Sequence, residues 1–307
     1  MTPVLKLRLF SGDTFTDETA CTAMTLTREA YTPYDEVTAT FLAGCADYGY
    51  VRRVGIFWGS TQVFLGIADK VEQFQKNGVR FVRVHARSFT AQLMQNQLEP
   101  GLHANITIGT LVQGYYPFPH VTYEADTRQG YIYVRERTSL WDCIVHFGYK
   151  LTAHHPYVTD NKVMLSPPDS ENVHTIAVGN IVESGTVYDT TKLMSHYHMA
   201  DMEGNPNAYQ QGNPAAVEAE IVRHKQIAFD RQYLSEPIKA LSFRNQFSQR
   251  GWKAKYVVYD GFANEKIGER MSYGQFVQNK VICRVRFTFG NGGWRTKLWI
   301  YEDGFYN

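Results

Sequence analysis

The chain lacks the short motifs that mark most catalytic and nucleotide-binding sites. It has no G-x-S-x-G nucleophile motif, no G-x-x-x-x-G-K-[ST] phosphate loop and no G-x-G-x-x-G dinucleotide fingerprint. Neighbouring carboxylates, such as Glu218 with Glu220 and Glu302 with Asp303, are typical of solvent-facing positions. We therefore expect a protein that is not an enzyme, with no catalytic residues and no cofactor.

Cysteine is scarce and the net charge is close to zero. The four cysteines, Cys21, Cys45, Cys143 and Cys283, include no C-x-x-C pair, which disfavours a disulfide scaffold and favours free thiols in a reducing compartment. The 31 basic and 30 acidic residues leave a net charge of +1, so there is no overall basic field to attract nucleic acid or an anionic membrane.

Long apolar runs are also missing. No segment approaches the roughly 18 apolar residues that cross a bilayer. The first ten residues alternate apolar side chains with Lys6 and Arg8, which is typical of a strand and not of a signal peptide. We expect no membrane insertion, and synthesis in the cytoplasm.

Aromatic residues are abundant, at 14% of the chain, and they favour β structure and association. Asn77-Gly78 between two apolar runs is a strong signal for a tight hairpin turn. The segment from Val281 to Tyr301 predicts a second hairpin, with its turn at 290–293. Both ends of the chain are therefore predicted to be rich in strands.

The stretch between Tyr131 and Met164 predicts a strand, a helix and a second extended run at 157–165. Ser139, with Asp142 three residues later, is a helix start signal, and Gly148 is expected to loosen the far end of the helix. The apolar residues of this helix fall on one buried stripe: Leu140, Cys143, Ile144, Phe147 and Leu151.

Further along, Asn213 and Pro214 predict the start of a helix that runs to about Leu234, and Pro237 predicts another that ends at Gly251. The fold class that follows is α+β. A β-barrel-like domain with one helix occupies 1–112, and a small strand–helix–strand domain occupies 113–168. A second β-barrel-like domain occupies 169–307, with a helical insertion at about 205–251.

Two histidines could form part of a metal site. His196 and His198 would lie on one side of a strand, and Asp201 is the only nearby third ligand. The ligand spacings that identify zinc and iron sites are absent, so we expect no bound metal and surface or interface histidines. A catalytic Cys–His pair remains open from the sequence, but Cys143 on the buried stripe would be a poor nucleophile.

The final hairpin carries an alternating basic pattern. Arg284 and Arg286 on its first strand, with Arg295 and Lys297 on its second, would make one side basic and the other apolar. An ordinary solvent-facing side explains this pattern. The alternative is a basic lining that faces nucleic acid or an acidic partner.

Several segments together resemble the baseplate hub proteins of contractile-tailed bacteriophages, of the T-even and Mu-like type, and of phage-derived particles of Gram-positive bacteria. They are 24–44, 54–74, 79–102, 131–151 and 219–261. The resemblance implies two barrel-like domains per subunit. It also implies a ring of three subunits that joins a hexameric tail tube to a trimeric central spike.

The partners implied by the resemblance are two further copies of the chain, the spike protein and the tube protein, with the tape measure protein and transiting DNA as additional candidates. The expected location is the virion tail baseplate, and the four basic residues of the final hairpin would face the lumen. No sequence repeat relates the two proposed barrels. A carbohydrate- or wall-binding tail module remains an alternative, as does a tail-associated peptidoglycan hydrolase, although the hydrolase lacks an acid/base signature.

Overall fold

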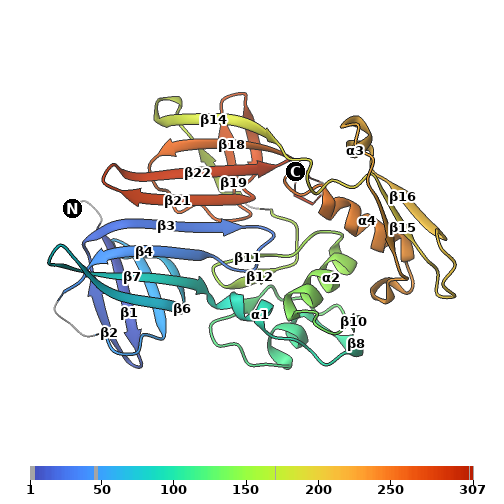
Figure 1. The fold of residues 1–307 in the computed structure, drawn as a ribbon, viewed down its shortest axis with the longest axis horizontal. Helices are drawn as coiled ribbons and strands as arrows, with labels where there is room; N and C mark the ends of the chain where they lie inside the picture. The colour runs from blue at the N-terminus through green and yellow to red at the C-terminus, as the bar shows by residue number, and fades with distance from the viewer. Residues whose placement is uncertain (1–3, 45–47, 170, 304, 307) are drawn as a thin grey trace.

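Eleven strands form the main sheet of the protein (Figure 1). The computed structural model describes residues 4–44, 48–169, 171–303 and 305–306. The N-terminal strands are β1 (Leu5–Ser11), β2 (Thr14–Glu18), β3 (Cys21–Glu29), β4 (Glu36–Leu42), β5 (Arg53–Trp58), β6 (Thr61–Lys76) and β7 (Val79–Ser88). The C-terminal strands are β14 (Ile181–Tyr188), β18 (Lys253–Asp260), β21 (Arg284–Gly290) and β22 (Gly293–Tyr301).

The two ends of the chain share this sheet, whose order is β14-β18-β22-β21-β3-β4-β7-β6-β5-β1-β2. Antiparallel pairing of β21 with β3 joins them, with Arg284 opposite Glu29 and Phe289 opposite Met24. Both predicted hairpins are confirmed, and Asn77 and Gly78 have the positive φ values, 51° and 78°, that the first turn needs. The strand-rich ends therefore form one continuous structure.

One side of the sheet carries the larger apolar core. Alternating side chains of both ends of the chain, such as Leu26, Val84, Phe287 and Leu298, are fully buried there. A second core lies under the middle of the chain and the insertion. The α+β class is confirmed. The described strands close no barrel, so the two barrel-like domains remain a prediction.

The middle of the chain contains one long helix and several short elements. These are a 3-10 turn (Phe89–Ala91), α1 (Gln92–Gln95), β8 (Gly101–Ile106), a π-helical turn (Thr110–Gly114), β9 (Thr122–Tyr123), β10 (Gly130–Val134), α2 (Leu140–Thr152), β11 (Tyr157–Thr159) and β12 (Lys162–Met164). Strand β10 pairs with β8, whereas β12 pairs with β11 and β9, so the strands before and after α2 belong to different sheets.

The start of α2 is confirmed, with a reciprocal capping box. The amide of Asp142 donates to Ser139 Oγ, and the amide of Ser139 donates to Asp142 Oδ2, both at 3.1 Å. The loosening expected at Gly148 stays a prediction. The helix continues to Thr152, and a Cβ added at Gly148 would lie 2.4 Å from Pro156 Cγ, so this glycine permits close packing.

The extended run expected at 157–165 is also corrected. It folds back on itself as the hairpin β11–β12, because Asp160 and Asn161 have positive φ values of 49° and 61°.

Within the described ranges, no helix is both long and apolar enough to cross a bilayer.

The C-terminal half adds two small sheets. One contains β13 (Val173–Thr175), β19 (Arg270–Tyr273) and β20 (Val277–Val281), and a 3-10 turn (Val178–Asn180) follows β13. The other contains β15 (His196–Met199), β16 (Tyr209–Gly212) and β17 (His224–Ile227), with α3 (Pro214–Glu218), a 3-10 turn (Arg231–Tyr233) and α4 (Pro237–Ser248) nearby. This second group projects to the right in Figure 1, where α4 packs against β15 and β16.

The helix predicted from Pro214 to about Leu234 is wrong in length. Its predicted start is confirmed, because Asn213 Oδ1 accepts a hydrogen bond from the Ala215 amide at 3.1 Å. The helix ends at Glu218, and Glu220 takes a positive φ of 55°. The chain then becomes β17, which pairs in parallel with β15. Tertiary strand pairing overrides the local helical pattern.

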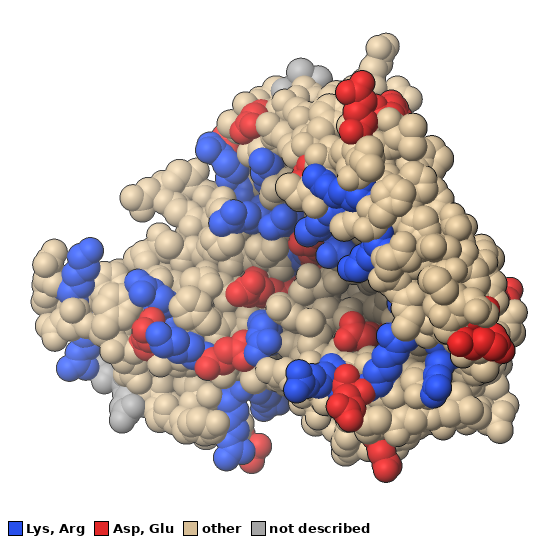
Figure 2. Space-filling view, turned by 45° about the vertical axis from the view of Figure 1, so that its right-hand side comes forward, with Lys and Arg blue, Asp and Glu red and all other residues tan. Residues whose placement is uncertain are grey.

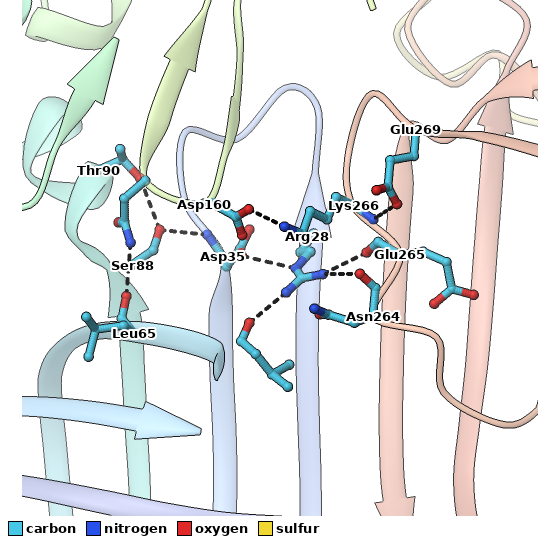
Figure 3. A network of polar contacts seen from close by, with 12 residues as sticks. Arg28, Asp35, Leu65, Ser88, Thr90, Asp160, Asn264, Glu265, Lys266 and Glu269 are labelled. Carbon is cyan, nitrogen blue, oxygen red and sulfur yellow. Dashed lines mark hydrogen bonds and ion pairs between the residues drawn. The ribbon is translucent and has the colours of Figure 1, made fainter. Parts of the chain in front are cut away.

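Arg28 is a buried cation at the junction of these parts (Figure 3). Its Nε lies 3.1 Å from Asp35 Oδ2. Its remaining donors reach carbonyl oxygens of distant segments: Val63 at 2.7 Å, Glu265 at 2.7 Å and Asn264 at 3.4 Å. One guanidinium therefore connects β3, β6 and the loop before β19.

The turn of the β11–β12 hairpin lies beside Arg28 (Figure 3). Asn161 Oδ1 accepts from the Phe89 amide at 2.6 Å, and Asn161 Nδ2 donates to the Leu65 carbonyl at 3.2 Å. Asp160 forms an ion pair with Lys266 of the loop before β19. The middle segment is thus attached to both strand-rich ends.

An aromatic cluster surrounds His155, which is buried. Its ring stacks on Phe247, with centroids 5.7 Å apart, and meets Tyr31 edge-on at 4.8 Å. Its Nδ1–H donates to the Pro156 carbonyl at 2.7 Å. Burial disfavours the imidazolium and lowers the pKa of His155 to about 3.

We predict that replacing Arg28 by Met destabilises the fold by about 3–5 kcal/mol, because the largely buried Asp35 loses its partner. The matched control, Arg8→Met, breaks the more exposed pair with Asp17 and should cost less than about 1 kcal/mol. The double variant Arg28→Met/Asp35→Leu should recover part of the loss. Urea unfolding measures the free energy of unfolding of all three variants. An equal loss of stability in the two single variants would contradict this role of Arg28.

We also predict that stability falls in acid, because the unfolded chain binds a proton at His155 that the folded chain excludes. The pKa of His155 in the folded chain, about 3, lies below the ordinary value of 6.5. The contribution of His155 to the free energy of unfolding is therefore fully present above pH 6.5 and is lost as the pH falls toward 3. The slope should be about 1.4 kcal/mol per pH unit steeper than in His155→Phe. Urea midpoints from pH 7.5 to 4.5 test this, with Leu26→Ala in the larger core as a destabilised control that keeps the wild-type slope.

Candidate functional site: the outer face of the main sheet

The side of the main sheet opposite its larger apolar core carries polar residues, and we call it the outer face. Antiparallel partners point to the same side of a sheet. The register places Arg286 opposite Lys297, Arg284 opposite Trp299, and Thr288 opposite Arg295. All four basic residues predicted from the sequence therefore share the outer face.

The charges of these four residues are partly compensated. Arg295 Nε lies 2.9 Å from Asp260 Oδ1, and Arg284 Nε lies 3.6 Å from Glu29 Oε2. Lys297 Nζ lies 3.9 Å above the centre of the Tyr256 ring. Arg286 is exposed and forms no ion pair with any described residue. The face is basic in places, and its charges alternate with aromatic and acidic groups.

The outer face continues onto the N-terminal strands. Thr27 pairs with Arg286, and the threonines of β3 and β4 lead across to Arg83, His85 and Arg87 on β7. Arg87 makes two hydrogen bonds to Asp69, at 2.7 and 2.8 Å. The β7 residues were not among those predicted from the sequence, although basic side chains alternate with apolar ones there as they do in the final hairpin.

A cavity of about 220 Å³ opens where the outer face meets the segment after β14 and the end of α4. The lining of this cavity includes Glu29, Tyr31, Asp189, Lys192, Arg250, Arg284, Trp299 and Tyr301. Figure 2 shows that Lys and Arg side chains, with some Asp and Glu among them, gather near the middle of one face of the molecule. Arg284 thus belongs both to the outer face and to the cavity.

The histidine pair lies as predicted on one side of β15, and a third histidine joins it. The ring of His224, on β17, stacks 4.4 Å from His196, and its Nδ1 lies 3.0 Å from His198 Nε2. Asp201 instead accepts hydrogen bonds from the amide and side chain of Asn205, both at 2.7 Å. In the described part of the chain, no group of three or more His, Cys, Asp or Glu side chains, this one included, is arranged so that it could hold a metal ion. Sequence spacing could not reveal His224, because strand pairing places it there.

The described cysteines, Cys21, Cys143 and Cys283, form no disulfide with one another. Cys45 lies outside the described residues. Cys143 is buried, and burial raises the pKa of its thiol to about 12, which disfavours the nucleophilic thiolate.

Solved structures of similar fold were found along the whole chain. A tail protein from Neisseria meningitidis MC58 superposes with a TM-score of 0.77 at 13% identity, covering 100% of this chain and 98% of that one. This chain has the tail-protein fold. The 43 kDa tail protein of prophage MuSo2 from Shewanella oneidensis gives a TM-score of 0.70 at 13% identity, covering 96% of this chain and 98% of that one.

A chain of the Francisella PdpA–VgrG complex shares the tail-protein fold more distantly, with a TM-score of 0.58 at 7% identity. The match covers 99% of this chain and 53% of that one. No family model and no curated protein matches the sequence. The predicted resemblance to phage tail proteins is confirmed at the level of the fold.

Proposed function

We propose that the chain is a structural baseplate hub protein of a phage tail. In this proposal three copies form a ring in the virion baseplate, which joins the hexameric tail tube to the trimeric central spike. The main support for the proposal is the match to two tail proteins, because it covers 98% of the length of each of them. Fold similarity alone does not fix function, so the ring and its partners need their own support.

The ends of the main sheet are suited to assembly. Strands β14 and β2 are its terminal strands, and each has one edge without a strand partner in the described chain. Large apolar side chains are exposed there: Val182, Val187 and Tyr188 on β14, and Phe15 on β2. A closed ring covers such edges, which otherwise favour uncontrolled pairing.

The division of the subunit is part of this proposal. Two barrel-like domains, 1–112 and 169–307, would alternate around the ring to give six similar units against the tube. The segment 113–168 would hold them together, and the helical insertion at about 205–251 would project from the second. The attachment of Asp160 and Asn161 to both strand-rich ends supports a connecting role for the middle segment.

The outer face is proposed to line the lumen. Its row of threonines and its partly compensated charges provide a hydrated surface along which DNA or the tape measure protein could pass without binding tightly. Arg284, Arg286, Arg295 and Lys297 would supply the positive charge of this lining.

The first test is the oligomeric state of the purified chain. We expect light scattering at micromolar concentration to give three times the mass of 35.2 kDa, with each interface burying more than roughly 2,000 Å² in total. A stable monomer at that concentration would contradict the hub proposal. Glycan binding by such a monomer would support the carbohydrate-binding alternative.

A second test reverses charge on the outer face. We expect Arg284→Glu/Arg286→Glu to leave the subunit folded and to reduce particle assembly or DNA delivery, because the lining becomes acidic. The matched control is Lys76→Glu/Arg80→Glu, which reverses two exposed cations at the β6–β7 turn. Particle yield and infectivity equal to those of the control would remove the lumen assignment.

A further inference from the structure

The cavity at the end of the outer face has more basic than acidic groups in its lining. Lys192 follows β14, Arg250 follows α4 and Arg284 begins β21, so three separate segments each bring one cation to the same space. Glu29 and Asp189 are the two acidic residues among the described lining residues. The local balance is therefore one positive charge.

The two arginines are poorly compensated where they lie. Arg250 is half-buried, and its guanidinium lies 3.6 Å from the centre of the Phe247 ring. Its Nη1 donates to the Phe247 carbonyl at 3.4 Å, and it forms no ion pair with a described residue. Arg284 Nε is buried and has no hydrogen-bond partner in the described ranges, since Glu29 Oε2 remains 3.6 Å away. Both guanidinium groups therefore retain donors that an oxyanion can use.

The two carboxylates already have other partners. Glu29 Oε1 accepts the Tyr301 hydroxyl at 3.0 Å. Asp189 Oδ1 accepts the amide and hydroxyl of Thr191, at 3.0 and 2.5 Å. Both carboxylates therefore share their charge with other groups, and three cations face two acids, so an anion from outside the chain would complete the set of interactions.

We propose that this cavity binds a phosphate group. Arginine forks match the oxygen geometry of phosphate, and three cations on separate segments suit a doubly charged oxyanion better than a single carboxylate. The phosphate is either free or part of a DNA backbone that follows the outer face into the cavity. Binding by the isolated chain does not require the trimer, so its failure is distinguishable from failure of the hub proposal.

Titration with inorganic phosphate tests the site, by calorimetry and thermal melting at constant ionic strength. We expect saturable binding, weakened by about tenfold or more in Arg250→Gln and Arg284→Gln, since each loses a charge-assisted contact. Arg52→Gln, an exposed arginine outside the cavity, is the matched control and should bind as the wild type does. Melting without phosphate checks that each variant folds, and Lys192→Gln replaces any variant that does not.

A short labelled DNA duplex distinguishes the two sources. Loss of both phosphate and DNA binding in the cavity variants would support a backbone phosphate. Loss of phosphate binding with unchanged or absent DNA binding would support a free ion. Equal responses to phosphate and to chloride of matched ionic strength, or equal phosphate affinity in Arg250→Gln and Arg52→Gln, would overturn the proposal.

Discussion

The buried guanidinium of Arg28 is the constraint on which the arrangement of the chain depends. Burial raises the pKa of its partner Asp35 while Arg28 opposes that shift, so each charge is tolerable mainly because the other is present. The remaining guanidinium donors need acceptors, and they find them on Val63 and on the 264–265 loop. Satisfying one side chain therefore fixes the relative positions of three distant segments.

Strand β21 pairs with β3 at this junction, so strands from the two ends of the chain form one sheet. The two sides of this sheet differ in character. The inner side carries the larger core, and the outer face presents threonines and partly compensated cations. The middle segment and the insertion bury apolar groups in a second core. The main sheet therefore presents a long polar face on the side away from its core.

Features with local signals could be predicted from the sequence. The capping box of α2, the Asn77-Gly78 turn, the final hairpin and the shared side of His196 and His198 all depend on neighbouring residues. Features set by tertiary pairing could not. The helix begun at Pro214 stops because β17 pairs with β15, and the same pairing brings His224 to the histidine pair. The cavity forms only where three distant segments meet, so the sequence around Arg250 could not predict it. The alternation of basic and apolar residues on β7 can be read from the sequence, but the prediction did not include it.

Electron cryo-microscopy of the purified protein tests the central claim most directly, because it reports both symmetry and the orientation of the sheet. The hub arrangement predicts a threefold ring in which six similar β-rich units surround a channel and the strands carrying Arg286 and His85 face inward. Separate single subunits, or a ring with that face turned outward or buried between subunits, would contradict it.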